Sequence, residues 1–315
     1  MTAPQTRWWP RGGRTFALAR WLSGVALALV AAVVLVRRTP LAELRVAAAR
    51  ADATWLAVAV ALTLVSETVF ASEKYRRILK LLGHTVSLRE VVRLRLGTYA
   101  VRSLAPYKLG EALRVAYLSR VLGVPVPAAA ASALLDMALH AAILAPFAAA
   151  GLQRLLRLSF GWLALGALTA FVAALAVART LGPRGRAALR LLVANRPTPT
   201  PRDLALLAVA GLLPAAAQVL AYLATLRAFG IAIDACAAAF DIPLVALVAD
   251  LPLTPFGVGT RELATVRVLA GRGPTPALLA AGLAASTVLR AVPAVLGLPS
   301  LVRLVGRLLA RRPRA

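Results

Sequence analysis

The stretch LPLTPFGVGTREL, at positions 251–263, places helix-breaking residues inside an otherwise apolar part of the chain. Pro252 and Pro255 end a helix, because proline lacks an amide proton and clashes with the preceding turn. Gly257 and Gly259 allow backbone conformations that other residues resist. The spacing predicts a break between two half-helices, with the second one starting directly after the glycines.

Two charged residues, Arg261 and Glu262, fall in the first turn of this second half-helix. The free N–H groups and the positive end of the helix dipole suit an anion such as a lipid phosphate, and an arginine adds a forked donor. Glu262 could pair with Arg261, cap the helix start or carry a proton. The alternative is that Glu262 only caps the helix while Arg261 reaches the surface. We predict substrate binding by both residues, with Gly257 and Gly259, because charge at membrane depth is rare without a task.

A second break occurs in RSLAPYKLGEALR, at positions 102–114. Pro106, Gly110 and Glu111 play parts that match those of the first motif. Glu111 and Arg114 are three residues apart, so they can face one another on a helix. We predict that these four residues also contact the substrate. The alternative is an interfacial helix whose basic side chains bind anionic head groups.

Further ionisable residues lie within long apolar segments. Asp136 and His140 are four apart and share a helix face, which fits either a proton relay or a mutually satisfied structural pair. Arg290 has no partner of opposite sign on its own helix, and we also predict that it binds the substrate. Its candidate partners elsewhere are Asp241, Asp250 and Glu262.

The composition indicates that lipid surrounds most of the chain. Of its 315 residues, 60% are hydrophobic and the mean hydropathy is +0.79, whereas soluble domains carry about 45–50% apolar residues. Six segments approach the roughly 20 residues that a helix needs to cross a bilayer. They are 17–36, 53–72, 127–150, 159–178, 203–229 and 276–300. Two apolar but broken segments, 88–121 and 235–271, each predict a helical hairpin that enters and leaves by the same face.

The net charge of +25 is clustered between the apolar segments, which indicates membrane topology and anionic head groups rather than nucleic acid. The positive-inside rule places both termini in the cytoplasm. A single cysteine, Cys236, and two histidines exclude an internal disulfide and a structural zinc site, so we expect neither a metal nor a cofactor.

The two breaks also indicate a repeat. PYKLGE at 106–111 resembles PFGVGTRE at 255–262, and the halves are offset by about 150 residues. With the predicted topology the two halves have opposite orientations, a plan common in transporters, with the substrate between them. We therefore predict a single all-α membrane domain that is a polytopic helical bundle with an inverted repeat. Its parts are a basic N-terminus (1–16), two half-repeats (17–158 and 159–305) and a basic tail (306–315).

The stretches LAPYKLGEALRVAYLSRVLGV and LPLTPFGVGTRELATVRVLAG resemble the membrane region of lysylphosphatidylglycerol synthase and its stand-alone, flippase-like (UPF0104-type) relatives. The resemblance covers most of 50–305. It implies the handling of phospholipids or polyprenyl- and isoprenoid-linked lipids in the cytoplasmic membrane. The third span departs from the family pattern Glu-Arg-x-x-Asp, since Asp136, Met137 and His140 stand there.

The resemblance leads us to expect a lipid-translocating protein of the plasma membrane, and the abundance of Arg and Ala over Lys indicates a bacterial source. The sequence shows no soluble aminoacyl-transfer domain, so we expect no lysyl transfer and assign no catalytic residue. The alternatives are a membrane-embedded transferase and an accessory subunit in lipid or glycolipid synthesis. The expected partners are an anionic or lipid-linked substrate and the bilayer, with a homo-oligomer or an envelope-synthesis protein as further candidates.

Overall fold

The computed structural model describes residues 40–104, 109–156, 200–250 and 259–310, and every regular element in these ranges is helical. The predicted spans 17–36 and 159–178 lie outside the described residues. The elements are α2 (Leu41–Ala49), α3 (Ala53–Val65), the π-helical turn η1 (Ser66–Phe70), α4 (Ala71–Leu81), α5 (Leu88–Leu104), α6 (Leu109–Arg120), α7 (Val126–Leu156), α10 (Pro201–Ala228), α11 (Ala235–Asp250), α12 (Thr260–Val268), α13 (Thr275–Ser286), the π-helical turn η3 (Thr287–Ala291) and α14 (Val292–Ala310).

Four helices in the described ranges are long and apolar enough to cross a membrane: Ala53–Leu81, Val126–Leu156, Pro201–Ala228 and Thr275–Ala310. Each coincides with a span predicted from the sequence. The first of them continues through η1 into α4, so the predicted end at residue 72 was too early. Residues 73–81 are therefore helical rather than part of a loop.

Two of the span helices, α3 and α10, begin where side chains satisfy their free amides. Asp52 accepts hydrogen bonds from the backbone N–H groups of Thr54 (2.7 Å) and Trp55 (3.4 Å) at the start of α3. At the start of α10, the Thr200 and Asp203 side chains each accept from the other residue's N–H, a capping box that Pro201 extends. Polar residues at these positions therefore fix the helix starts.

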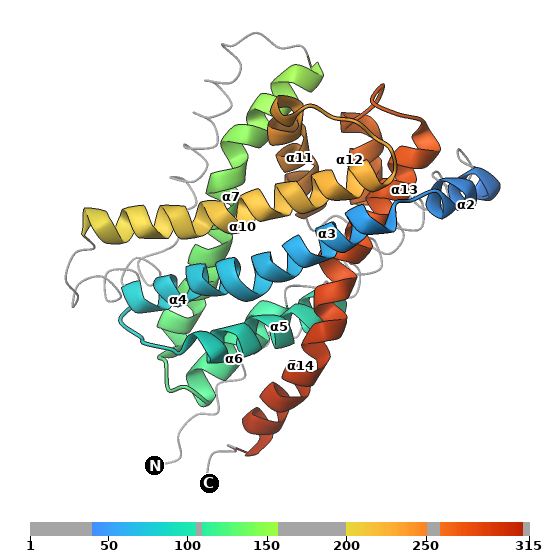
Figure 1. The fold of residues 1–315 in the computed structure, drawn as a ribbon. Coiled ribbons are helices and arrows are strands. Elements are labelled where there is room, and N and C mark those ends of the chain that lie inside the picture. The colour runs from blue at the N-terminus through green and yellow to red at the C-terminus, as the bar shows by residue number, and fades with distance from the viewer. Residues whose placement is uncertain (1–39, 105–108, 157–199, 251–258, 311–315) are drawn as a thin grey trace, which may run out of the picture.

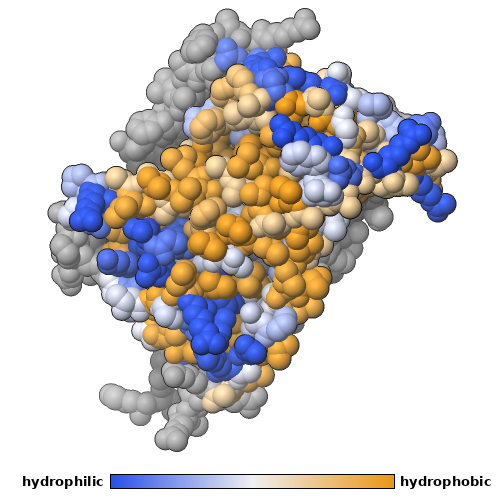
Figure 2. Space-filling view, in the orientation of Figure 1, coloured by the Kyte–Doolittle hydropathy of each residue, from blue (hydrophilic) through white to orange (hydrophobic). Residues whose placement is uncertain are grey.

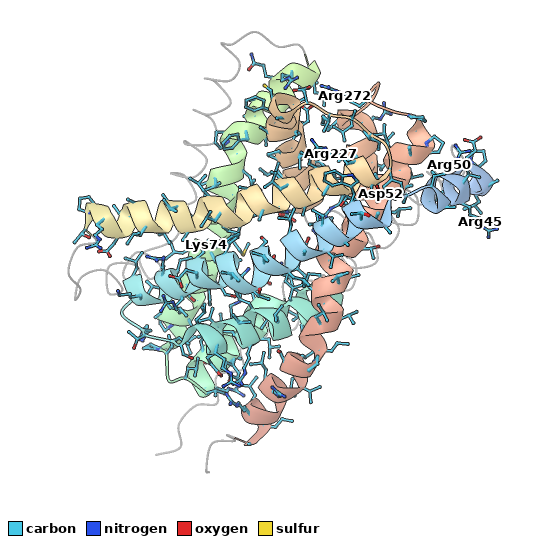
Figure 3. All side chains as sticks on the ribbon, viewed as in Figure 1. Arg45, Arg50, Asp52, Lys74, Arg227 and Arg272 are labelled. Atoms are coloured by element: carbon cyan, nitrogen blue, oxygen red, sulfur yellow. The ribbon has the colours of Figure 1, made fainter. Side chains whose placement is uncertain are left out.

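The helix formed by α3, η1 and α4 lies antiparallel to α10, and this pair crosses the middle of the molecule (Figure 1). The Asp52 N–H donates to the Ala228 carbonyl (2.8 Å), which joins the start of α3 to the end of α10. Further along, the Ser66 hydroxyl donates to the Pro214 carbonyl (3.2 Å). In Figure 3, Asp52 and Arg227 lie at one end of this pair and Lys74 lies further along it.

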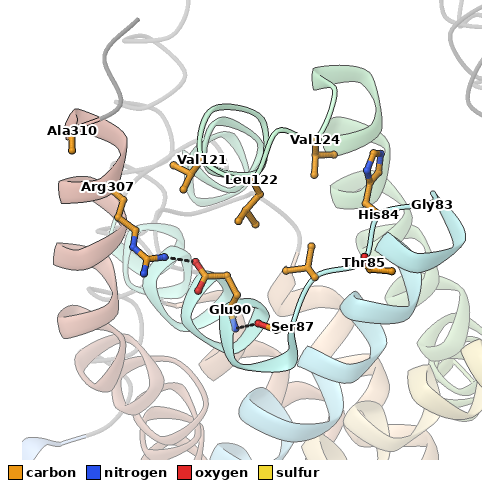
Figure 4. A pocket seen from close by; sticks show the side chains of 11 residues that line it. Gly83, His84, Thr85, Ser87, Glu90, Val121, Leu122, Val124, Arg307 and Ala310 are labelled. Carbon is orange, nitrogen blue, oxygen red and sulfur yellow. Dashed lines mark hydrogen bonds and ion pairs between the residues drawn. The ribbon is translucent and has the colours of Figure 1, made fainter.

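Helices α5 and α6 form the first hairpin. The Tyr117 hydroxyl near the end of α6 donates to Glu90 near the start of α5. The segments 83–87 and 121–124 line one pocket, so the hairpin starts and ends on the same side of the molecule (Figure 4). The arms approach closely at Gly110, where an added Cβ would lie 2.6 Å from the Thr98 carbonyl oxygen.

Helices α11 and α12 form the second hairpin. At the start of α11 the Ala237 N–H donates to Asp234 (2.7 Å) and lowers the pKa of that carboxyl. Arg272, just after α12, donates to Asp234 (3.2 Å) and lies 3.8 Å from Asp241. These contacts join the start of the second hairpin to its end.

Each hairpin packs against a span of the other half of the chain. Helix α5 lies along α14, and α11 lies along α7. Both contacts are close because a glycine of the span faces the hairpin backbone. At Gly297, an added Cβ would lie 2.1 Å from the carbonyl oxygen of Leu96. At Gly151, it would lie 2.5 Å from the carbonyl oxygen of Phe240.

Two large apolar clusters form the interior, one around Tyr75 and Leu118 in the first half and one around Tyr222 and Ile242 in the second. Large apolar side chains also cover the outside, where a broad hydrophobic surface extends over the crossing helices (Figure 2). Hydrophilic side chains gather in separate patches on the same face. An apolar exterior over helices is what a bilayer requires, since each helix satisfies its own backbone groups.

Candidate functional site

Asp136 of α7 is surrounded by three buried cations. Its carboxylate lies 2.7 Å from Lys74 Nζ of α4, 3.1 Å from Arg95 Nη1 of α5 and 3.1 Å from Arg114 Nη1 of α6. At most 9% of any of these four side chains is exposed. We call these four residues the Asp136 cluster. It ties four helices together, because buried charges must be paired.

Glu67 supplies a second acid to the Asp136 cluster. It sits on the π-helical turn η1 and accepts a bond of 3.0 Å from Arg95. Arg114 stacks over the Tyr75 ring at 4.7 Å, while the Tyr75 hydroxyl bonds to Ser132 (2.8 Å). Three cations therefore share two acids and an aromatic face. A surplus positive charge remains inside the first half.

The start of α12 is fixed by Glu262. Gly259 has φ of 87°, a conformation that favours glycine, and its N–H donates to Glu262 Oε2 (2.6 Å). The other carboxylate oxygen accepts from the Ser286 hydroxyl of α13 (2.7 Å). Glu262 thus caps the half-helix, as one of the alternatives predicted, and joins it to the next span.

Arg261 does not reach the surface. The residue is only 3% exposed, and its nearest described partner is the Ala285 carbonyl, at the long distance of 3.5 Å. Within the described residues one weak bond holds this buried guanidinium, which leaves most of its donors for another group.

Arg290 lies on the π-helical turn η3 and reaches the end of α11. It donates to the Ala249 carbonyl (3.2 Å) and to the Asp250 carboxylate (3.0 Å). His140 Nε2 of α7 lies 3.6 Å from the same carboxylate. These side chains are partly open, since 27% of Arg290, 43% of Asp250 and 30% of His140 is exposed.

The inner ends of the two hairpins converge. The Tyr99 hydroxyl of α5 donates to the Leu289 carbonyl of η3 (2.6 Å), and Arg102 stacks over the Tyr99 ring at 4.3 Å. Arg102 is also near enough to Asp250 and Arg290 to interact with their charges. The residues that gather there, which we call the tip site, are Arg102, Glu111, His140, Asp250, Arg261 and Arg290.

The structure brings most of the predicted site residues to this region. Arg261, Glu262, Gly259 and Arg290 belong to its second-hairpin side, and Glu111 begins α6 on the other side. Gly110 serves the close packing of α5 and α6. Pro106 and Gly257 lie outside the described residues.

Two predicted pairings are wrong. Asp136 and His140 share a helix, but they do not pair with each other. Asp136 forms ion pairs with three cations, and His140 lies beside Asp250. Arg114 turns to Asp136 rather than to Glu111, because Asp136 is buried beside it. One carboxylate oxygen of Glu111 is buried without a hydrogen-bond partner.

Sequence reasoning missed Lys74 and Arg95 as interior residues. Neither was predicted as a buried residue, yet they are 4% and 5% exposed. The sequence signal that could have found them was Asp136, because an acid within an apolar span needs cationic partners and its own helix supplies none nearby. Arg102 was not predicted as a site residue either.

Long apolar helices, paired broken helices and interior charges define a polytopic helical membrane protein. The family model described as the lysylphosphatidylglycerol synthase TM region matches residues 21–297. The chain belongs to that family, as the sequence motifs indicated. The comparison with curated proteins found no match.

Proposed function

We propose that this protein moves an anionic lipid, either a phospholipid or a polyprenyl-linked lipid, between the leaflets of the cytoplasmic membrane. The observation that carries the proposal is the tip site, where partly exposed charges of both signs lie between the inner ends of two broken helices. Charges in the interior of a membrane protein mark substrate and ion pathways. The family supports a role in lipid metabolism or transport.

The same proposal includes an inverted repeat. Helix α5 pairs with the last span of the second half, and α11 pairs with the last span of the first half. Both pairs are antiparallel: Glu90 bonds to Arg307 at one end of the molecule (2.7 Å), and Arg154 stacks on Phe240 in the other pair (5.9 Å). Two hairpins that enter from opposite faces and meet inside fit transporters, which bind substrate where the repeats meet.

The lipid phosphate would be bound by Arg290, Arg261 and Arg102. In the structure the Asp250 carboxylate accepts from Arg290, and an incoming phosphate would compete for the same donors, because a guanidinium binds carboxylates and phosphates in the same forked geometry. Asp250 then remains beside His140, which keeps the displaced charge partnered. This exchange gives the site two states, with and without lipid.

Glu111 and Glu262 organise the two half-helix starts rather than bind the lipid. Glu262 makes both of its bonds within the protein. Glu262→Gln keeps one acceptor oxygen and loses the other, so it should destabilise the fold by roughly 1 kcal/mol. If the charge matters only for capping, translocation per folded molecule should stay near the wild-type rate.

Reconstituted vesicles test the function. A head-group-labelled phosphatidylglycerol should change leaflet in the presence of the protein and be recovered chemically unchanged. Recovery of a modified head group would favour the alternative, a membrane-embedded transferase. A lack of both crossing and modification would favour an accessory subunit.

Arg261 tests the site. Arg261→Lys keeps the charge but loses the planar fork, so it should slow translocation while the protein still folds. Arg261→Ala should slow it further. The matched control is Arg45→Gln, which removes one exposed charge from α2. If both Arg261→Ala and Glu262→Gln translocate lipid at the wild-type rate, the motif has only a structural role and the site assignment is wrong.

A further inference from the structure

A second cationic site lies at the end of the molecule remote from the tip site. A pocket of about 530 Å³ opens between α5, α6 and α14. Its walls carry three guanidinium groups, from Arg93, Arg303 and Arg307, and the hydroxyl of Tyr117. None of these residues belongs to the tip site or to the Asp136 cluster.

One acid serves this pocket among the described residues. Glu90 accepts from Arg307 (2.7 Å) and from Arg93 (3.4 Å). Arg303 is exposed and makes no hydrogen bond or ion pair that involves the described part of the chain. Three cations with one carboxylate leave two positive charges for a ligand. The pocket therefore suits an anion with several oxygens, as phosphate has.

The pocket continues into a larger one. Arg307 and Ala310 line both this pocket and a neighbouring cavity of about 840 Å³, which His84, Thr85 and Ser87 also line (Figure 4). This second space adds polar groups next to the cations. It could hold the uncharged part of a head group while the phosphate stays with the arginines.

The outer face of α14 indicates that the anion belongs to a lipid. Val302, Val305 and Leu309 are 71%, 38% and 59% exposed, and their spacing places them on one helix face. Arg303 and Arg307 are four residues apart and share the neighbouring face. A head group in the pocket would thus leave its acyl chains against an apolar surface, which a soluble anion does not need.

We propose that Arg93, Arg303, Arg307 and Tyr117 form a binding site for the phosphate of an anionic phospholipid in the leaflet at this end of the molecule. The charge pattern predicts that this end faces the cytoplasm, where basic pockets between helices bind such head groups. The site is separate from the translocation path. It holds a resident lipid against α5 and α14, the pair that carries the first hairpin.

Native mass spectrometry of the full chain in detergent tests the site, because it counts each bound lipid. The probes are dioctanoyl phosphatidylglycerol, dioctanoyl phosphatidylcholine and inorganic phosphate. Arg303→Gln/Arg307→Gln should bind one phosphatidylglycerol fewer, with that binding step about tenfold weaker or more, since each basic residue near a membrane surface contributes about 1 kcal/mol. Arg45→Gln/Arg50→Gln, which removes the same charge from an exposed position of α2 and from the exposed residue that follows it, should bind as the wild type does.

A second variant tests whether binding depends on the shape of the pocket as well as on its charge. An added Cβ on Gly306 meets nothing within 4 Å, so Gly306→Leu should fold and fill the pocket while every arginine stays. It should weaken the same binding step. Unchanged binding in both pocket variants would overturn the site. Equal binding of phosphatidylcholine, or of inorganic phosphate at the same concentration, would overturn the assignment to an anionic lipid.

Discussion

Each hairpin contains two helices, but the charged side chains around the two hairpins are arranged differently. In the first half, the charges are buried and paired: Asp136 alone binds three cations from three helices. In the second half, Arg261 is held weakly, while Arg290 and Asp250 are partly open. The comparison indicates that the first hairpin is fixed in place by ion pairs and that the second presents charges that a substrate can engage.

The acids of the two similar motifs also differ in their hydrogen bonds. The acid of the first motif, Glu111, has a buried oxygen without a hydrogen bond, whereas the acid of the second, Glu262, makes a bond with each oxygen. Similar sequence motifs can therefore place their acids in different surroundings.

The largest expected effect concerns the sidedness of the hairpins. In a Cys236→Ser background, Thr85→Cys and Val126→Cys flank the first hairpin, and Ala232→Cys precedes the second. Thr85→Cys and Val126→Cys should react with an impermeant thiol reagent from the cytoplasmic side only, and Ala232→Cys from the outside only. Labelling of all three from one side would contradict the inverted repeat.

The next effect tests the fixed hairpin. Asp136→Asn leaves three buried cations with too little negative charge, so it should lower the free energy of unfolding by about 3–5 kcal/mol. Thermal unfolding in detergent measures it. Glu73→Gln is the control, because Glu73 pairs with Arg76 and Arg77, whose side chains are 46% and 33% exposed, and the variant should cost about 0–1 kcal/mol. Equal costs for both variants would mean that the Asp136 cluster does not hold the first half together.

A smaller effect compares the two crosswise contacts. Gly297→Ala and Gly151→Ala each place a Cβ against a carbonyl oxygen of the opposite hairpin, which should destabilise the protein by roughly 1–3 kcal/mol. Gly306→Ala, on the same helix as Gly297, meets open space and should be neutral or stabilise by up to about 1 kcal/mol. A cost at only one of the two contacts would show that the halves are held unequally.

The sequence predicts the coarse fold well because hydropathy and helix breakers are local signals. The four described spans and both hairpins follow from apolar length and from residues such as Pro252 and Gly110. The ion pairs do not follow, because Lys74 and Asp136 are 62 residues apart and a lysine after an apolar run looks interfacial. The sequence also does not indicate the π-helical turn at Ser66–Phe70, through which the helix continues past the predicted end of the span.

The candidate site was predicted in part. Arg261, Glu262 and Arg290 stood out because charge is rare in apolar segments. Their partners depend on how the two halves meet, which no local pattern specifies. Asp250 is one of three acids that the sequence offered to Arg290, and only the packing of α11 against η3 and α7 selects it.

The most direct test compares lipid translocation in Arg290→Ala with that in Lys80→Ala. Lys80 is an exposed cation of α4, far along the chain from the tip site. The rate of leaflet exchange of labelled phosphatidylglycerol is measured per folded molecule in reconstituted vesicles. We predict that Arg290→Ala lowers this rate about tenfold or more, because a lost charged hydrogen bond is worth roughly 1.5–3 kcal/mol, while Lys80→Ala keeps the wild-type rate. Equal rates in the two variants would contradict the proposal that the tip site binds the translocated lipid.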